Sequence, residues 1–143
     1  MRIYLDNCSF NRPFDDQSQL RIKIETEAKQ FVQQQITFGN YELVWSYVLD
    51  FENSQNPYEE KKLSVLKWKD LAKIYCVENE FIISKAKELR KIGLKLMDSL
   101  HTACAIYSEC DYFITTDKGI YNKTINGIKV VNPINFINEL EEI

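Results

Sequence analysis

Five short apolar segments alternate along the chain with longer segments of helical periodicity. The short segments are rich in β-branched and aromatic residues and are bounded by Asp, Asn or Gly, which is typical of buried strands. They cover Arg2–Leu5, Tyr41–Trp45, Ile74–Val77, Tyr112–Thr115 and Ile128–Val131. Strands that alternate with helices in this way predict an α/β fold of three layers, with a central five-stranded parallel sheet between helices.

The segments between the strands carry apolar residues at helical spacing. A long helix is predicted to end at Gly39, with a buried stripe made of Leu20, Ile24, Ala28, Phe31, Val32 and Ile36. Further helices are predicted over residues 47–55, 57–73, 81–92, 98–107 and 134–140, and loops over 8–17 and 116–119. Ser46 is the expected N-cap of the second helix, and Gly93 the expected end of the fourth.

Two of these helices have a predicted core-facing side. In the helix over 47–55, Val48 and Phe51 are expected to point at the core, which places Glu52 on the inward side as well. In the helix over 57–73, Leu63, Leu66 and Leu71 are the expected anchors.

Length and composition favour one globular domain over residues 1–143, since 45% of the residues are hydrophobic and 13% are aromatic. No apolar run approaches the roughly 20 residues that cross a bilayer. The first residues are too few and too acidic for a signal peptide, so we expect a cytoplasmic protein without a membrane partner.

The cysteines and the net charge bear on two classes of function, zinc binding and nucleic-acid binding. The four cysteines form no CxxC pair, and His101 is the one histidine, so buried free thiols are favoured over a zinc site. A net charge of −3 does not indicate a nucleic-acid binder, although a local basic rim around an acidic site is compatible with it.

Two predicted strands are followed by aspartates, Asp6 and Asp117. Asp98 lies in the first turn of a predicted helix, and Glu52 lies on an inward helix face. Each acid alone has an ordinary explanation, such as a helix-start or surface residue. If the first and fourth strands are neighbours, however, Asp6 and Asp117 project into one crevice at the carboxyl edge of the sheet, where Glu52 and Asp98 can reach them.

Carboxylates gathered in this way require a cation. Two of them about 5 Å apart repel by roughly 3 kcal/mol at an effective dielectric near 20. Oxygen ligands alone select a hard ion, Mg²⁺ or Mn²⁺. Such an ion keeps several waters and lowers the pKa of one, which becomes a nucleophile toward phosphorus.

Three segments carry a resemblance to the PIN domain family, especially to VapC-type toxins. They are MRIYLDNCSFNRPF, SYVLDFENSQNP and LKLMDSLHTACAIYSECDYFITTDKGIYNK, and the similarity extends over nearly the whole chain. The resemblance implies a sheet of order 3-2-1-4-5, in which the first and fourth strands are neighbours. It also implies a Mg²⁺- or Mn²⁺-dependent ribonuclease that cleaves single-stranded or exposed RNA.

By position, Asp6, Glu52, Asp98 and Asp117 resemble the acidic quartet of this family, which is both catalytic and metal-binding. In the family the second acid usually precedes an aliphatic residue, whereas Asn53 follows Glu52 here, so Asp50 stays open as the alternative.

The resemblance also extends to residues beside the acids. Thr116 matches the hydroxyl that accompanies the last acid, and Asn7 matches a polar neighbour of the first. Arg12 and Lys118 flank the acids in sequence and are candidates for RNA phosphate binding. The resemblance further implies a homodimer and neutralisation by an antitoxin chain.

Two other functions are compatible with the fold. One is a catalytically silent PIN-like module that binds RNA or protein. The other is a receiver-type phosphoacceptor switch, which needs an acidic pair after the first strand and an Asp after the third. Asp6-Asn7 supplies one acid, and Cys76-Val77-Glu78-Asn79 supplies no Asp, so the sequence disfavours it.

Overall fold

The computed structural model of the chain describes residues 1–11 and 19–141, and its central element is a five-stranded sheet. All four strand pairs are parallel, and the order is β3-β2-β1-β4-β5. The strands are β1 (Arg2–Leu5), β2 (Glu42–Ser46), β3 (Ile74–Cys76), β4 (Tyr112–Ile114) and β5 (Lys129–Val131). The predicted α/β fold and the adjacency of the first and fourth strands are therefore confirmed.

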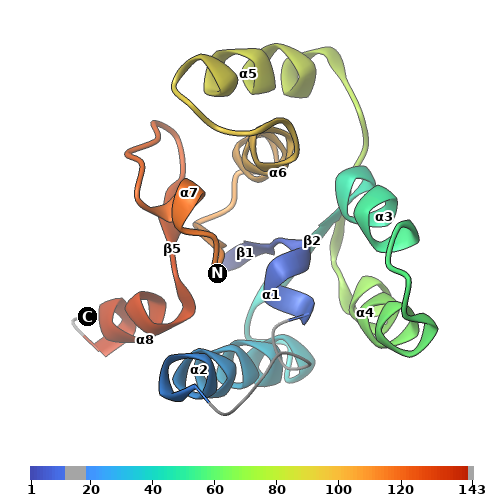
Figure 1. Ribbon diagram of the computed structural model, residues 1–143, viewed down its shortest axis with the longest axis vertical. Coiled ribbons are helices and arrows are strands. Elements are labelled where there is room, and N and C mark those ends of the chain that lie inside the picture. Colours follow the sequence, from blue (N-terminus) through green and yellow to red (C-terminus); the bar gives the residue numbers. More distant parts are fainter. Residues whose placement is uncertain (12–18, 142–143) are drawn as a thin grey trace.

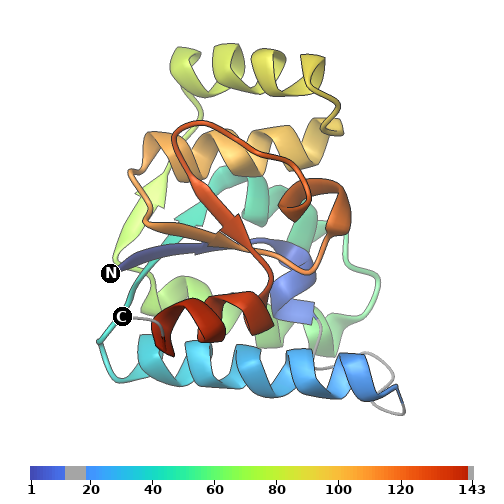
Figure 2. The same ribbon diagram turned by 90° about the vertical axis from the view of Figure 1, so that its left-hand side faces the viewer.

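Helices cover the sheet on both sides (Figures 1 and 2), so the molecule has three layers. One face carries α5 (Glu80–Lys91) and α6 (Leu96–Tyr107), and the opposite face carries α2 (Leu20–Thr37) and α8 (Pro133–Glu141). The chain also forms α3 (Tyr47–Ser54), α4 (Glu59–Leu71), and two short helices, α1 (Asn7–Asn11) and α7 (Lys118–Tyr121). The short helices replace parts of the predicted loops 8–17 and 116–119, because one turn of helix satisfies backbone groups directly after a strand.

The core is built around the central strand β1. Tyr4 of β1, Trp45 of β2 and Phe113 of β4 are fully buried, and Tyr4 meets Phe113 edge to face with their ring centroids 5.2 Å apart. The chain continues from β1 to β2 and β3 on one side of β1, and later adds β4 and β5 on the other side. The strand order therefore changes direction at β1. Such a switch point opens a crevice at the carboxyl ends of the strands.

The long helix α2 buries a different stripe from the predicted one. Val32 and Ile36 are buried as expected, but Leu20 is 72% exposed, and Ile24 and Phe31 are also exposed. The remaining buried positions of α2 are Glu25, Thr26 and Lys29. The helix is thus rotated so that part of its apolar residues faces α8 and solvent, and Glu25 is stabilised inside by Arg21, with 2.9 Å between Nε and Oε1.

The predicted core faces of α3 and α4 are also partly wrong. Phe51 of α3 is 57% exposed, and the buried residues are Val48, Leu49 and Asn53. In α4, Leu63 and Leu71 are exposed and Val65 is buried.

The predicted helix ends at Ser46 and Gly93 are confirmed. Ser46 Oγ accepts the Leu49 N–H at 3.1 Å, and Gly93 follows α5 with φ +104°. Cys76, Cys104 and Cys110 are buried free thiols, as expected. Within the described ranges, no helix combines the length and apolar character of a membrane span.

Candidate functional site

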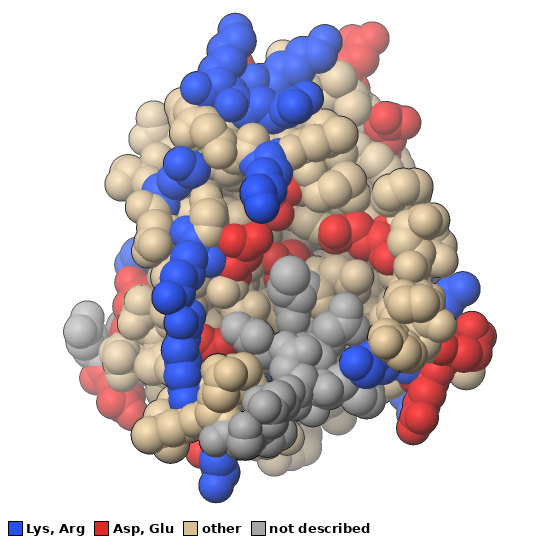
Figure 3. Space-filling view, in the orientation of Figure 1, with Lys and Arg blue, Asp and Glu red and all other residues tan. Residues whose placement is uncertain are grey.

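Four acids from four different elements meet at the carboxyl ends of β1 and β4. Asp6 directly follows β1, Asp117 is the N-cap of α7, Glu52 belongs to α3, and Asp98 lies in the first turn of α6. In the space-filling view, acidic side chains gather near the middle of this face, with Lys and Arg along its upper and left margins (Figure 3).

The charges of the other three acids all act on the carboxyl group of Asp98. Partial burial raises its pKa to about 6, and the nearby charges of Asp117, Asp6 and Glu52 contribute to the increase. Like charges shift a pKa in this way only over short distances. The four acids that the sequence singled out therefore lie within electrostatic reach of Asp98, and their role as one site stays a prediction.

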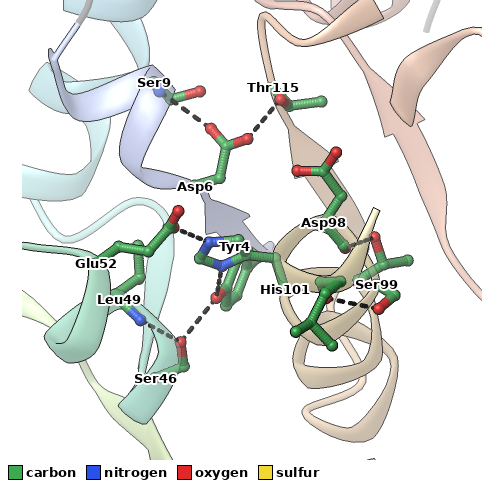
Figure 4. Close-up of polar contacts among 12 residues, drawn as sticks. Tyr4, Asp6, Ser9, Ser46, Leu49, Glu52, Asp98, Ser99, His101 and Thr115 are labelled. Carbon is green, nitrogen blue, oxygen red and sulfur yellow. Dashed lines mark hydrogen bonds and ion pairs between the residues drawn. The ribbon is translucent and has the colours of Figure 1, made fainter. Parts of the chain in front are cut away.

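Asp6 is fixed in place by hydrogen bonds to both carboxylate oxygens (Figure 4). Its Oδ1 accepts the Ser9 N–H at 3.0 Å, and its Oδ2 accepts the Thr115 hydroxyl at 2.6 Å. Burial raises the pKa of Asp6, while the nearby His101 and the bonds from Thr115 and Ser9 act in the opposite direction. The carboxylate is buried and strictly oriented.

Thr115 is a site residue that the sequence analysis did not select. Besides donating to Asp6, its Oγ1 accepts the Asp117 N–H at 3.1 Å, so one side chain connects the first and last acids. The sequence signal was available, because Thr115 follows β4 just as Asp6 follows β1, and the two strands pair with Leu5 opposite Ile114.

Glu52 is held by His101, which the sequence analysis treated only as an argument against zinc. The His101 Nε2 contacts Glu52 Oε1, and its Nδ1 lies 2.5 Å from the Tyr4 hydroxyl. The Tyr4 hydroxyl in turn lies 2.7 Å from Ser46 Oγ. Figure 4 shows this chain running from the α3 N-cap to the crevice.

Ser46, Tyr4, His101 and Glu52 form a continuous series of polar contacts. An ionised carboxylate only accepts, so Nε2 of His101 donates to Glu52. Burial raises the pKa of Tyr4 far above its usual value, so its hydroxyl keeps its proton and can donate either to Nδ1 of His101 or to Ser46 Oγ. Ser46 Oγ also accepts the Leu49 N–H.

Asp50, the alternative second acid, faces another part of the molecule. It accepts hydrogen bonds from Trp45 Nε1 at 2.8 Å and from the Tyr75 hydroxyl, and Lys69 Nζ lies 3.1 Å from its Oδ1. Burial alone would raise the pKa of Asp50, but the bonds from Tyr75, Trp45 and Lys69 outweigh it and lower the pKa. Asp50 is an acid with its own structural partners.

The remaining candidates from the sequence are the residues expected to contact RNA beside the acids. Asn7 is partly buried and lines a pocket together with Glu52. Thr116 is buried, Lys118 is exposed beside Asp117, and Arg12 lies outside the described residues.

The carboxylate oxygens of the four acids are suitable ligands for a hard divalent cation, although they are not arranged as a ready-made metal site. Within residues 1–11 and 19–141, no three His, Cys, Asp or Glu side chains form a ready-made metal cluster. Mg²⁺ is usually bound through one or two carboxylates and keeps several waters, so it does not need such a cluster. Oriented carboxylates are compatible with this mode, in which Asp6, Glu52, Asp98 and Asp117 would hold the ion directly or through water.

Comparison with known proteins gives a likeness of fold. No family model matches the chain, and no curated protein sequence matches it. Among solved structures, the chain is similar to VapBC2 from Rickettsia felis bound to a DNA fragment from their promoter, with a TM-score of 0.59 and 15% identity. The match covers 92% of this chain and 98% of that chain. At this identity the likeness extends to the fold alone.

Proposed function

We propose that the chain is a Mg²⁺- or Mn²⁺-dependent endoribonuclease that hydrolyses RNA phosphodiester bonds. The observation that carries the proposal is the position of Asp6, Glu52, Asp98 and Asp117 around the carboxyl ends of the paired strands β1 and β4. Gathering four acids costs folding free energy, which is typical of functional sites and is removed when a cation binds. The resemblance of the acidic segments to PIN domains and the likeness of fold support the same function.

A bound divalent ion would lower the pKa of a coordinated water and neutralise charge on the phosphoryl oxygen. The protein would supply fixed oxygen ligands: Ser9 and Thr115 hold Asp6, and His101 holds Glu52. Basic side chains at the margins of the acidic face would attract the RNA backbone. Because the nucleophile is water, the ribose 2′-hydroxyl takes no part.

We further propose that the chain is the toxin of a toxin–antitoxin pair. The likeness of fold to VapBC2 bound to promoter DNA supports an antitoxin chain as the proposed protein partner. The proposed homodimer rests on the resemblance to VapC-type toxins alone.

The decisive experiment incubates pure protein with mixed RNA in Mn²⁺ or in EDTA and identifies the product ends. Metal-dependent cleavage with 5′-phosphate ends is expected, with loss of activity in Asp6→Ala and Asp98→Asn. Asp70→Asn removes an exposed acid of α4 and serves as the matched control. Activity in EDTA, or 2′,3′-cyclic phosphate ends, would refute the mechanism.

A second candidate is a catalytically silent PIN-like module that binds RNA or protein. One observation favours it, namely that no three metal-binding side chains in the described part of the chain converge as they stand. RNA binding without cleavage at any Mn²⁺ concentration, and without a metal-induced rise in melting temperature, would establish this alternative.

A further inference from the structure

A pocket of about 360 Å³ lies beside the acidic crevice and shares a wall with it. Asn7 and Glu52 belong to both. The remaining lining comes from the segment that joins α3 to α4 and from the first turn of α4, namely Gln55, Asn56, Pro57, Tyr58 and Lys61. A group bound here would be next to a phosphate bound at the acids.

Tyr58 gives this pocket an aromatic wall. The side chain is 63% exposed, although a tyrosine ring usually gains from burial. Its backbone is nevertheless fixed, because the Tyr58 N–H donates to Asn56 Oδ1 at 3.1 Å. The Lys61 ammonium lies 4.9 Å from the ring centroid, which places a positive charge at the same spot.

Amide groups supply the polar part of the pocket. Asn7 Oδ1 is buried and has no hydrogen-bond partner in the described part of the chain, which is unfavourable unless a bound molecule donates to it. Gln55 and Asn56 add further amides to the lining. An aromatic face beside amide groups, with the Asn7 oxygen still unpaired, matches a flat, uncharged molecule that has donors on its edge.

From these contacts we propose that the pocket is a subsite for one nucleobase of single-stranded RNA, with the base stacked on Tyr58. The proposal rests on the proposed ribonuclease function. Glu52 in the wall disfavours a carboxylate ligand, and an apolar peptide would leave Asn7 Oδ1 unpaired. A base next to the scissile phosphate satisfies both conditions, and Lys61 lies where the neighbouring phosphate can be neutralised.

The test measures RNA affinity separately from cleavage. A labelled single-stranded oligonucleotide is titrated by fluorescence anisotropy against Asp98→Asn protein in Mg²⁺, so that the RNA stays intact. In this background Tyr58→Phe should bind like the parent, because it keeps the ring. Tyr58→Leu keeps apolar bulk but loses the stacking face, and should weaken binding about 5- to 100-fold.

Two controls make the result specific to a base in this pocket. Tyr107→Leu alters another exposed tyrosine, at the opposite end of α6 from Asp98, and should leave affinity unchanged. An oligonucleotide with one abasic position at the subsite should bind the parent and Tyr58→Leu equally. Melting temperatures and circular dichroism verify that each variant is folded.

The outcomes separate the subsite from the nuclease proposal. If RNA is cleaved with metal but Tyr58→Leu binds like the parent, the subsite is wrong and the nuclease stands. If affinity depends on Tyr58 and on the base but no metal-dependent cleavage occurs, the subsite stands and the nuclease fails. If the parent binds no single-stranded RNA, the subsite is refuted.

Discussion

The imidazole of His101 holds the carboxylate of Glu52 across 49 positions of sequence, through Nε2 and Oε1. His101 is itself buried, with only 2% of its surface exposed, and is oriented by Tyr4. At metal sites, residues that form hydrogen bonds to the metal ligands fix the orientation of those ligands. The loss of such a residue typically costs 10- to 100-fold in metal affinity. The geometry of one proposed ligand therefore depends on a residue that would not touch the metal.

The first prediction concerns this contact. His101→Ala should weaken Mn²⁺ binding about 10-fold or more and lower the melting temperature, because it removes the donor to Glu52 and one of the two partners of the Tyr4 hydroxyl. His101→Gln retains an amide donor and should recover part of the Mn²⁺ affinity. Mn²⁺ titration by electron paramagnetic resonance provides the measurement. Equal affinity in wild type and His101→Ala would show that His101 serves stability alone.

The second prediction decides between the two candidate second acids. Glu52→Gln keeps size but removes charge, and should reduce Mn²⁺ affinity and RNA cleavage at least about 10-fold. Asp50→Asn should leave both nearly unchanged, because Asp50 is engaged by Trp45, Tyr75 and Lys69. It should instead lower the melting temperature by a few degrees. The reverse pattern would require the site to be rebuilt around Asp50.

The third prediction concerns the pH dependence of stability without metal. Asp98 has a folded-state pKa of about 6, against about 3.9 in an unfolded chain. Between these values the folded state binds a proton that the unfolded state has released. The stabilisation is therefore complete below about pH 4 and is lost as the pH rises through 6.

The matched variant for this pH prediction is Asp98→Asn, which imitates the protonated acid. In EDTA its melting temperature should equal that of wild type near pH 4 and exceed it by a few degrees at pH 7.5, after allowance for solvent screening. Added Mn²⁺ should stabilise only wild type, and less so below pH 6, because the ligand must be deprotonated. A constant difference between the two proteins across this pH range would contradict the prediction.

The fourth prediction distinguishes two adjacent threonines. Thr115→Val keeps shape but removes the hydroxyl that links Asp6 to the Asp117 backbone, which should cost about 1–3 kcal/mol of stability. Thr115→Ser should recover most of this stability. Thr116→Val is the matched control, since the hydroxyl that bonds to Asp6 and to the Asp117 N–H belongs to Thr115. Urea unfolding measures all three, and equal losses for both valine variants would refute the assignment.

The sequence predicts the sheet and the position of its acids well, for a clear physical reason. A strand buried on both faces ends where polar residues begin, so the end of β1 locates Asp6 and the polar segment after β4 locates Asp117. The order of the strands depends on contacts between residues that are far apart in sequence. The hydrophobic pattern alone therefore did not determine whether the first and fourth strands are neighbours. The family resemblance supplied that order.

The buried faces of the helices are predicted less well. Apolar residues of α2 occupy two neighbouring faces, so periodicity does not determine which one meets the sheet, and Glu25 is buried while Ile24 is exposed. Tertiary contact with α8 and the ion pair from Arg21 decide between the faces.

The bonds from Thr115 to Asp6 and from His101 to Glu52 were harder to predict, because each joins residues that lie far apart in sequence. One local signal for His101 did exist. His101 follows Asp98 by three positions, which places both on one face of α6. A histidine on the face that carries a candidate ligand is a candidate partner for the next acid, and the structure pairs it with Glu52.

The central position of β1 has a consequence for a chain still attached to the ribosome. β1 is made first, yet its neighbour β4 follows about a hundred residues later, and the Asp6–Thr115 bond joins residues 109 apart. The acidic crevice therefore cannot assemble until β4 has left the exit tunnel. A nascent chain that pauses earlier carries β1 as an open edge, with Ile3, Tyr4 and Leu5 uncovered, and such edges pair with other chains. The order of synthesis thus delays assembly of the acidic crevice and leaves the unfinished sheet prone to aggregation.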